Sequence, residues 1–526
     1  MTIPATSEPV EAGPAKPKRR ARNQRPVMAR AISNLSAGTI TPPRLAINVV
    51  SFATPSFPKR SVDITQFGAI GNGTHNCGGA INTAIESLHA KGGGTVRIPP
   101  GVWFTGRVQL RSNIHLHLDE GAVLRFSDDP RQYLPAVPVR AFGQDCLNYS
   151  PLIYAHQSSH IAITGNGVIQ GNGERWYALV KPEAGAVSKL YDMVVAGIPA
   201  EQRRFGSEAH PIRPALIGLI HCTDVLLDGF SIPQGGPLWT IHLAYCARST
   251  LRNLRIDTTQ GPNNDCIVID SCDGAIIEHC DLNSRDDCIA IKSGLNEDGW
   301  RVNRPTENVV IRNIIARGGK SAVTIGSEMS GGARNILISD LQIEGVDSGI
   351  RFKAARGRGG VIEKIHIRDV EIRHAVQDAI HLSTDHSAYL SPDGKPPTIR
   401  NIVLERIHCR GAKCAARLVG LPDRCIEDIL FHDVDLVADE GFCCLSAQRL
   451  HLTNARVTAK HGPAFLLQDT RGVFINGLRQ PPADRVYLDL RGRLTRDVRL
   501  GGEASESIRP IIVLGVDVPR DAVFVD

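Results

Sequence analysis

The stretch VVIRNIIARGGKSAVTIGSEMSGGARNILISD, residues 309–340, contains the pattern that decides the fold. It begins and ends with the same short unit, in which apolar residues at alternate positions are followed by Asn or Asp. The alternation predicts a short strand with one buried face, and the Asn or Asp predicts a turn. Since the unit recurs within one stretch, we expect the chain to fold as a series of similar coils.

The same unit recurs along most of the chain. Full copies start at positions 161, 225, 309, 336, 365, 429 and 450, and weaker copies start at 249, 275 and 402. Most spacings are about 20 to 37 residues, which is typical of solenoid repeats. Tight hairpin dipeptides are few and the leucine ladder of leucine-rich repeats is missing. The repeats therefore favour an all-β, single-stranded parallel β-helix built of stacked coils.

Composition divides the chain into segments. Residues 1–45 are rich in Pro, Ala, Ser and Arg without periodicity, which predicts a disordered basic tail. We expect the β-helix over 46–480, opened by a short capping helix around 81–88. Residues 170–213 break the rhythm and are expected to form an insertion over one face. The remaining 481–526 are predicted to form C-terminal strands and a tail.

The formal net charge of +6 is concentrated at the N-terminus. Residues 1–30 hold seven basic side chains against two glutamates, which accounts for +5 and leaves +1 for the rest. We interpret the tail as a solvated arm, so no nucleic acid or membrane partner is expected. The thirteen cysteines lack metal-type spacing, and those in strand-like stretches are predicted to be buried free thiols.

Three carboxylates fall within two neighbouring repeats: Asp265 in GPNNDCIVID, and Asp286 and Asp287 in SRDDCIAIKSG. The 21 residues from Asp265 to Asp286 are close to one coil, so stacking can place both on one face. Carboxylates that share a site repel one another, which raises the pKa of at least one of them. An acid that keeps its proton beside an ionised base is the pairing that glycoside hydrolysis needs.

Cations accompany these acids. Arg351 and Lys353, in SGIRFKAARGRGG, lie two residues apart and so share one face of a strand. They suit an acidic sugar, because Arg binds a carboxylate through a bidentate fork. Lys292, in IAIKSG, is a further candidate cation for the substrate. The alternative for all three is an ordinary solvated strand face.

On these motifs the chain resembles the polygalacturonases, family 28 of the glycoside hydrolases, from about Val62 to at least Gly360. NND matches the family's Asn-Thr-Asp, DD matches its aspartate pair, and RFK matches its Arg-Ile-Lys. The resemblance implies a right-handed β-helix of the pectin-lyase-like type. It also implies an inverting glycosidase that cleaves α-1,4-galacturonosyl bonds of pectic polysaccharide without a cofactor or metal.

The resemblance further implies a role for each matched residue. Asp286 is expected to be the general acid, and Asp265 and Asp287 are expected to activate water. Arg351 and Lys353 are expected to hold the carboxylate of galacturonate.

Two positions depart from the family pattern. The family's Gly-His-Gly before IGS reads differently here, so its histidine position falls on Lys320 or Ser321. The second aspartate that follows Asn-Thr-Asp by three residues is Val268. Lys320 is expected to supply the missing positive charge. His242, in WTIHLAYC, is expected either to line the sugar groove, as the family suggests, or to be a buried structural histidine.

The expected mode of action is exo, because an insertion across the groove would close one end of it. Three alternatives stay open. The substrate can be a rhamnogalacturonan or a substituted galacturonan. The three aspartates can instead hold Ca²⁺ in a pectate lyase. The protein can also be a carbohydrate-binding β-helix with weakened catalysis, which the two departures support.

The partner expected from these considerations is a pectic polysaccharide or an oligogalacturonide, bound by a monomer. Its location follows from the substrate and from the N-terminus. A polymer lies outside most bacterial cells, which favours an extracellular protein. No ordinary signal peptide is visible, so export by a non-classical route is expected, with a cytoplasmic oligosaccharide hydrolase as the alternative.

Overall fold

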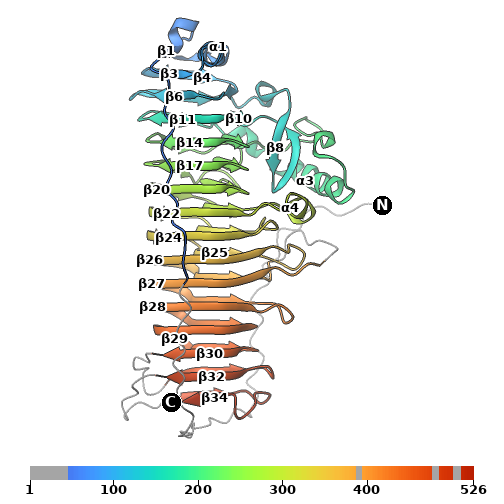
Figure 1. The fold of residues 1–526 in the computed structure, drawn as a ribbon, viewed down its shortest axis with the longest axis vertical. Coiled ribbons are helices and arrows are strands. Elements are labelled where there is room, and N and C mark those ends of the chain that lie inside the picture. Colours follow the sequence, from blue (N-terminus) through green and yellow to red (C-terminus); the bar gives the residue numbers. More distant parts are fainter. Residues whose placement is uncertain (1–44, 387–393, 477–484, 502–510, 526) are drawn as a thin grey trace.

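The computed structural model describes residues 45–386, 394–476, 485–501 and 511–525. The chain winds into an elongated stack of coils whose strands lie parallel, one above the next (Figure 1). The fold is the predicted all-β, right-handed parallel β-helix. The predicted disordered tail lies outside the described residues.

Parallel pairing sorts the strands into three faces, which we call the first, second and third face. Strands of the first face alone are β1 (Ser61–Asp63), β3 (Gly94–Ile98), β6 (Ile114–Leu118), β11 (Ser159–Gly165), β14 (Thr223–Asp228), β17 (Ala247–Arg252), β30 (Arg471–Asn476), β32 (Arg496–Gly501) and β34 (Val523–Val525). Those of the second face are β2 (Asn72–Asn76), β4 (Gly101–Thr105), β7 (Ala122–Phe126), β12 (Val168–Gln170), β15 (Ser231–Gln234) and β18 (Arg255–Thr258).

The third face carries the predicted site residues. Its strands are β5 (Val108–Gln109), β10 (Ile153–His156), β13 (Ile217–Ile220), β16 (Ile241–Ala244), β19 (Ile267–Asp270), β21 (Asp287–Lys292), β23 (Ser321–Gly326), β25 (Ser348–Lys353), β31 (Val486–Arg491) and β33 (Ile511–Leu514). Longer strands turn corners and belong to more than one face: β20 (Asp273–Ser284), β22 (Thr306–Arg317), β24 (Ala333–Glu344), β26 (Val361–Ser383), β27 (Thr398–Val419), β28 (Ile426–Leu445) and β29 (Ala447–Gln468).

The Asn or Asp that closes the repeat unit makes the corner between the first and second faces. Asn313, Asp340, Asp369, Asp433 and Asn454 all have a positive φ, between 51° and 58°. Asn and Asp adopt this left-handed conformation more readily than other residues with a side chain. The repeat read from the sequence is therefore a strand followed by its corner.

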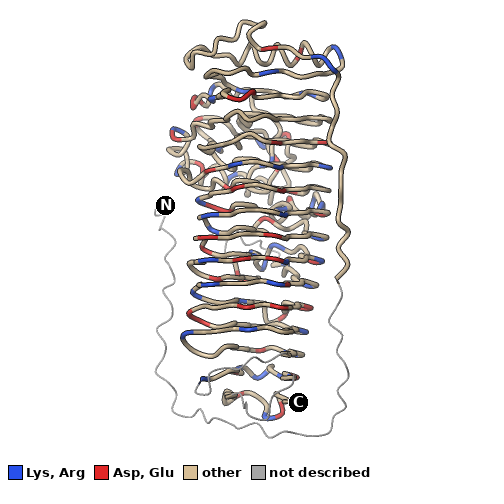
Figure 2. Tube along the Cα trace, turned by 90° about the vertical axis from the view of Figure 1, so that its left-hand side faces the viewer, with Lys and Arg blue, Asp and Glu red and all other residues tan. Residues whose placement is uncertain are grey.

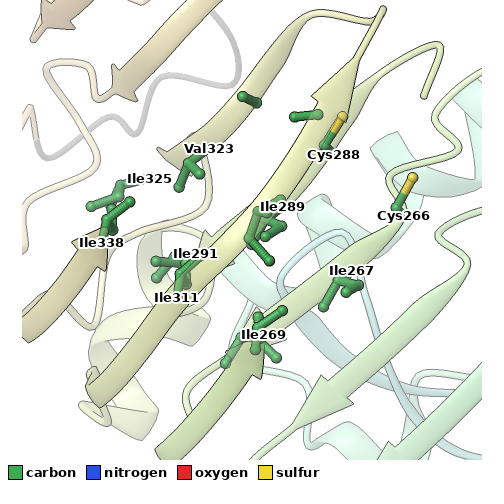
Figure 3. Close-up of a cluster of buried hydrophobic side chains, with 14 of the residues drawn as sticks. Cys266, Ile267, Ile269, Cys288, Ile289, Ile291, Ile311, Val323, Ile325 and Ile338 are labelled. Atoms are coloured by element: carbon green, nitrogen blue, oxygen red, sulfur yellow. The ribbon is translucent and has the colours of Figure 1, made fainter. Parts of the chain in front are cut away.

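The alternating apolar residues fill the interior of the coils (Figure 3). On the third face Ile267 pairs with Ile289, which pairs with Val323, and Val323 pairs with Ile350. All four side chains are buried. Burial of one such side chain stabilises the fold by about 1.5 to 3 kcal/mol. Like residues stacked coil upon coil thus hold the third face rigid beneath the site.

A helix covers the N-terminal end of the stack, as predicted. Helix α1 (Gly78–His89) buries Ile81, Ile85 and Leu88, which lie on one of its faces. The short 3₁₀ helix η1 (Ile64–Phe67) packs beside it. The two close the hydrophobic interior above the first coils.

The first described residues, 45–60, run along the outside of the coils (Figures 1 and 2). Asn48 exchanges two hydrogen bonds with Asn335, at 2.9 and 3.1 Å. Phe52 packs on the apolar patch over the middle coils, and Phe57 stacks on His115 near the N-terminal end. We call residues 45–60 the strap.

Two additions to the coils lie together beside the third face. One is an antiparallel hairpin of β8 (Val137–Ala141) and β9 (Gln144–Asn148), preceded by the 3₁₀ helix η2 (Pro130–Tyr133). The other is the predicted insertion, which contains α2 (Glu174–Tyr177), α3 (Val180–Val195) and the 3₁₀ helix η3 (Ala200–Gln202). Helix α3 packs its apolar side against the hairpin in one buried cluster.

Strand pairing continues past residue 480, where the sequence analysis placed the end of the β-helix. Strands β31 and β33 extend the third face, and β32 and β34 extend the first. All thirteen cysteines lie within the described residues and are free, and most are buried, as predicted for those in strands. Among the described helices, none has the length and apolar character needed to cross a membrane.

Acidic and basic residues alternate along the coils (Figure 2), and several of them pair between successive coils. The pairs are Arg248–Asp224, Arg252–Asp228, Arg312–Glu278, Arg334–Glu307 and Arg400–Glu363. Exposed pairs of this kind contribute little to stability.

Candidate active site

Stacking on the third face brings the three aspartates together. Asp265 lies just before β19, Asp286 lies in the turn before β21, and Asp287 is the first residue of β21. Ile267 pairs with Ile289, so one coil here is 22 residues long. The vertical neighbour of Asp265 is therefore Asp287, not Asp286 as the spacing of 21 suggested. The peptide N–H of Cys266 donates to the Asp287 carbonyl at 3.1 Å.

Asp287 is held as a carboxylate. Although burial favours its neutral form, Lys353 lowers its pKa by its charge and by donating to Oδ2 at 2.8 Å. Thr324 donates to Oδ1 at 2.9 Å, and Ser321 donates to the same oxygen. Three donors that converge on one buried carboxylate keep it ionised.

The pKa values of the other two aspartates are raised, not lowered. Burial raises the pKa of Asp265 well above its usual value, and the charge of Asp286 adds to this. Burial and the charge of Asp287 raise the pKa of Asp286. Asp286 is half-buried, whereas Asp265 and Asp287 are buried, so Asp286 is the most accessible of the three. The site thus holds one carboxyl group with a lowered pKa beside an accessible carboxyl group with a raised pKa.

Arg351 and Lys353 extend from β25 toward the same region. Lys353 reaches Asp287, and Arg351 pairs in register with Thr324 of β23. The Nε of Arg351 is buried and has no hydrogen-bond partner among the described residues. An unsatisfied buried donor costs free energy unless a ligand accepts from it. Arg351 as a whole is half-buried, and its guanidinium can bind an anionic group.

A second ion pair lies at the other end of β21. Lys292 donates to Glu328 at 2.6 Å, and its ammonium lies 4.9 Å from the centre of the Trp239 ring. Although burial opposes ionisation, the charge of Lys292 lowers the pKa of Glu328 to about 2. Glu328 was missed in the sequence, because it stands in the loop after β23 outside the acid and cation motifs. Its position directly after the IGS signature was the only signal available.

The two remaining candidates differ in their distance from the acids, since the N–H of Lys320 donates to the Asp286 carbonyl at 2.9 Å. His242 is buried, its Nε2 is 3.7 Å from Asp270, and its ring packs edge-on against Trp239. This is the structural alternative that the sequence left open. Lys320 is exposed and pairs with Asp347 at 2.8 Å. Of the two positions considered for the family's histidine, Ser321 is the one whose side chain bonds to one of the three aspartates.

The tip of the β8–β9 hairpin covers part of the third face beside the three aspartates. Phe142 packs on Trp239 and on the buried pair Val268 and Ala290, which belong to the coils of the aspartates. Gly143 has a φ of 77° and its carbonyl accepts from the Leu295 N–H at 2.9 Å. Val268 therefore lies under an aromatic ring, where an aspartate would be buried without a partner.

Buried charges fix the hairpin and the insertion to the coils. Arg140 of β8 lies 3.2 Å from Asp270 of β19, and both side chains are fully buried. Arg213, which follows the insertion, pairs with Glu183 of α3 at 2.7 Å. Arg213 also donates to the Pro262 carbonyl in the loop that leads to Asp265, at 3.0 Å. The additions are thus anchored directly beside the acids.

Comparison with known proteins agrees with this geometry. The sequence pattern of the glycosyl hydrolases family 28 matches residues 203–455. A solved exopolygalacturonase from Thermotoga maritima is 31% identical, superposes with a TM-score of 0.70, and covers 81% of this chain and 94% of its own. This chain belongs to family 28 of the glycosyl hydrolases.

Two curated relatives agree with the family assignment. A "Probable polygalacturonase" of Vitis vinifera is 28% identical over 73% of this chain and 77% of its own length. An "Exo-poly-alpha-D-galacturonosidase" of Dickeya chrysanthemi is 25% identical over 65% of this chain, which spans 59% of that protein. As a family 28 member the chain is a glycosidase, which hydrolyses O-glycosyl bonds, and the prediction of a pectin-degrading hydrolase is confirmed.

Proposed function

We propose that this family 28 enzyme removes single galacturonate residues from the end of a pectic chain by inverting hydrolysis of α-1,4 bonds. The observation that carries the proposal is the site itself. An ionised Asp287 and an accessible Asp286 with a raised pKa lie beside Arg351, a cation with an unsatisfied buried donor. Relatives with this activity in their names support the choice of galacturonate.

The proposed reaction uses one proton transfer at each carboxyl group. Asp286 donates its proton to the glycosidic oxygen as the bond to the anomeric carbon breaks. Asp287 accepts a proton from a water molecule, whose oxygen attacks that carbon from the opposite side of the sugar. Arg351 and Lys353 hold the carboxylate of a sugar residue during this step. Asp265, which is buried beside the other two aspartates, can orient the water.

Exo action follows from the position of the hairpin. Phe142 covers Val268 and Ala290, which lie in the same coils as the three aspartates. On the opposite side, Arg351 and Lys353 lie on β25, further toward the C-terminal end of the stack. A chain laid along the third face therefore meets the hairpin tip beside the acids. We infer that its terminal residue binds beneath the hairpin.

Product analysis on polygalacturonate tests the proposal. We expect monogalacturonate as the main product from the earliest times, with inverted configuration at the new anomeric carbon by NMR. Asp286→Asn should lose this activity while it keeps its fold by circular dichroism. A ladder of oligomers would refute exo action. An unsaturated product that requires Ca²⁺ would favour a lyase, and no product on any pectic polymer would favour a binding protein.

A further inference from the structure

The Lys292–Glu328 pair has no part in the reaction described above, and its setting is unusual for a structural contact. The two side chains are 6% and 13% exposed and are joined at 2.6 Å. A buried ion pair of this kind is often no more stabilising than an apolar pair of the same size. Two buried charges that add little to stability therefore suggest another role, either binding of a ligand or a structural constraint.

The pair lies between the hairpin tip and the aspartates. A Cβ atom built on Gly143, at the hairpin tip, would lie 3.0 Å from the Cβ of Glu328, so the two elements are in close contact. Lys292 lies against Trp239, which in turn contacts Phe142 of the tip. On its other side, Lys292 is close enough to Asp265 for the aspartate to stabilise its charge. The pair therefore lies beneath the hairpin tip, beside the aspartates.

The chemistry of the pair matches the two kinds of group on a terminal uronic acid residue. An ammonium has three donors, and the bond to Glu328 uses one of them, so a sugar carboxylate can be held by another. An ionised carboxylate only accepts hydrogen bonds, which suits neighbouring sugar hydroxyls. Glu328 also repels the carboxylate of the sugar. This carboxylate can therefore lie only on the Lys292 side of the pair, which fixes the orientation of the uronate.

We propose that Lys292 and Glu328 form the recognition site for the terminal uronic acid residue at the non-reducing end of the chain. Lys292 binds its carboxylate, and Glu328 accepts hydrogen bonds from its free hydroxyls, including the C4 hydroxyl that only a chain end exposes. Glu328 is thus a specificity-determining residue that selects chain ends. This inference rests on the proposed exo hydrolysis of galacturonan.

Two trimers test the role of Glu328. One is trigalacturonate, and the other is the trimer with a 4,5-unsaturated terminal residue, which lacks the C4 hydroxyl. We expect the wild-type enzyme to prefer the saturated trimer by about 100-fold or more in kcat/KM, because a buried acceptor is otherwise left unpaired. Glu328→Gln should reduce this preference to about tenfold or less. Asp439→Asn, in the exposed pair with Lys460, is the matched control and should keep the full preference.

Lys292 gives a different signature. Both trimers carry a carboxylate, so Lys292→Met should raise KM for the two alike and leave their ratio unchanged. Equal preference in the wild type and Glu328→Gln would overturn the inference. If neither trimer is hydrolysed, the proposed function fails, and calorimetric binding of the two trimers then decides. Tighter binding of the saturated trimer by the wild type, lost in Glu328→Gln, would support the recognition site, and equal binding would overturn it.

Discussion

The two hydroxyl groups that contact Asp287 offer a direct test of how this site works without the family's histidine. Thr324 donates to Asp287 at 2.9 Å, and Ser321 donates to the same oxygen. Both residues are fully buried, so water cannot readily replace them. Thr324→Val and Ser321→Ala each remove one donor with little change of shape.

The size of the effect follows from the charge of the acceptor. A hydrogen bond to a charged group contributes about 1.5 to 3 kcal/mol. One unit of pKa corresponds to about 1.4 kcal/mol, so each substitution should raise the pKa of Asp287 by about 1 to 2 units. The native pKa lies below the usual range. Removal of a donor therefore moves it upward, and the base becomes protonated at a higher pH.

The assay is the pH dependence of kcat/KM for release of monogalacturonate. The acidic limb reports the ionisation of the base in the free enzyme. We expect this limb to move to higher pH by about 1 to 2 units in each variant, with a smaller effect at the plateau. Ser348→Ala is the control, because Ser348 is buried next to Ser321 in register but makes no described bond to Asp287. An unmoved acidic limb in both variants would refute the assignment of Asp287 as the base.

Three further predictions concern stability and products. Arg213→Met should lower the free energy of unfolding in urea by about 3 to 5 kcal/mol, because Glu183 stays buried without its partner. The double variant Arg213→Met with Glu183→Met should regain most of the lost free energy of unfolding. An equal loss in the single and the double variant would contradict this reason. Ile289→Ala should cost about 2 to 5 kcal/mol in the same assay, unless the stacked core can collapse around the gap. Phe142→Ala should add oligomers to the products of polygalacturonate, and unchanged release of monomer alone would show that the hairpin tip is not the barrier.

The sequence was sufficient to predict the coils because each repeat encodes its own geometry. Alternating apolar residues mark the strand, and a residue such as Asn313 or Asp369 marks the corner with its positive φ. Local patterns of this kind need no knowledge of distant contacts. The same regularity placed the three aspartates on one face, although the partner of Asp265 is displaced by one residue.

What the sequence did not predict depends on contacts between distant segments. The β8–β9 hairpin turns at Phe142 and Gly143, and the φ of 47° at Phe142 is rare for a bulky residue, so the pair does not match the usual hairpin dipeptides. Glu328 gains its importance only from Lys292, which stands on another coil. The anchors of the insertion, such as Arg213 with Glu183, likewise join residues 30 positions apart. No periodicity reveals a pair of this kind.

The strap gives this molecule a property that simple repeat proteins lack. In most solenoids each coil contacts only its neighbours, so the two ends can melt independently. Here one segment joins His115, near the N-terminal end, to Asn335, beyond the coils of the catalytic aspartates. Loss of either anchor would weaken the contacts of the strap with the coils between His115 and Asn335. The catalytic coils therefore gain a shared melting transition with the N-terminal cap, while the C-terminal coils remain free to fray on their own.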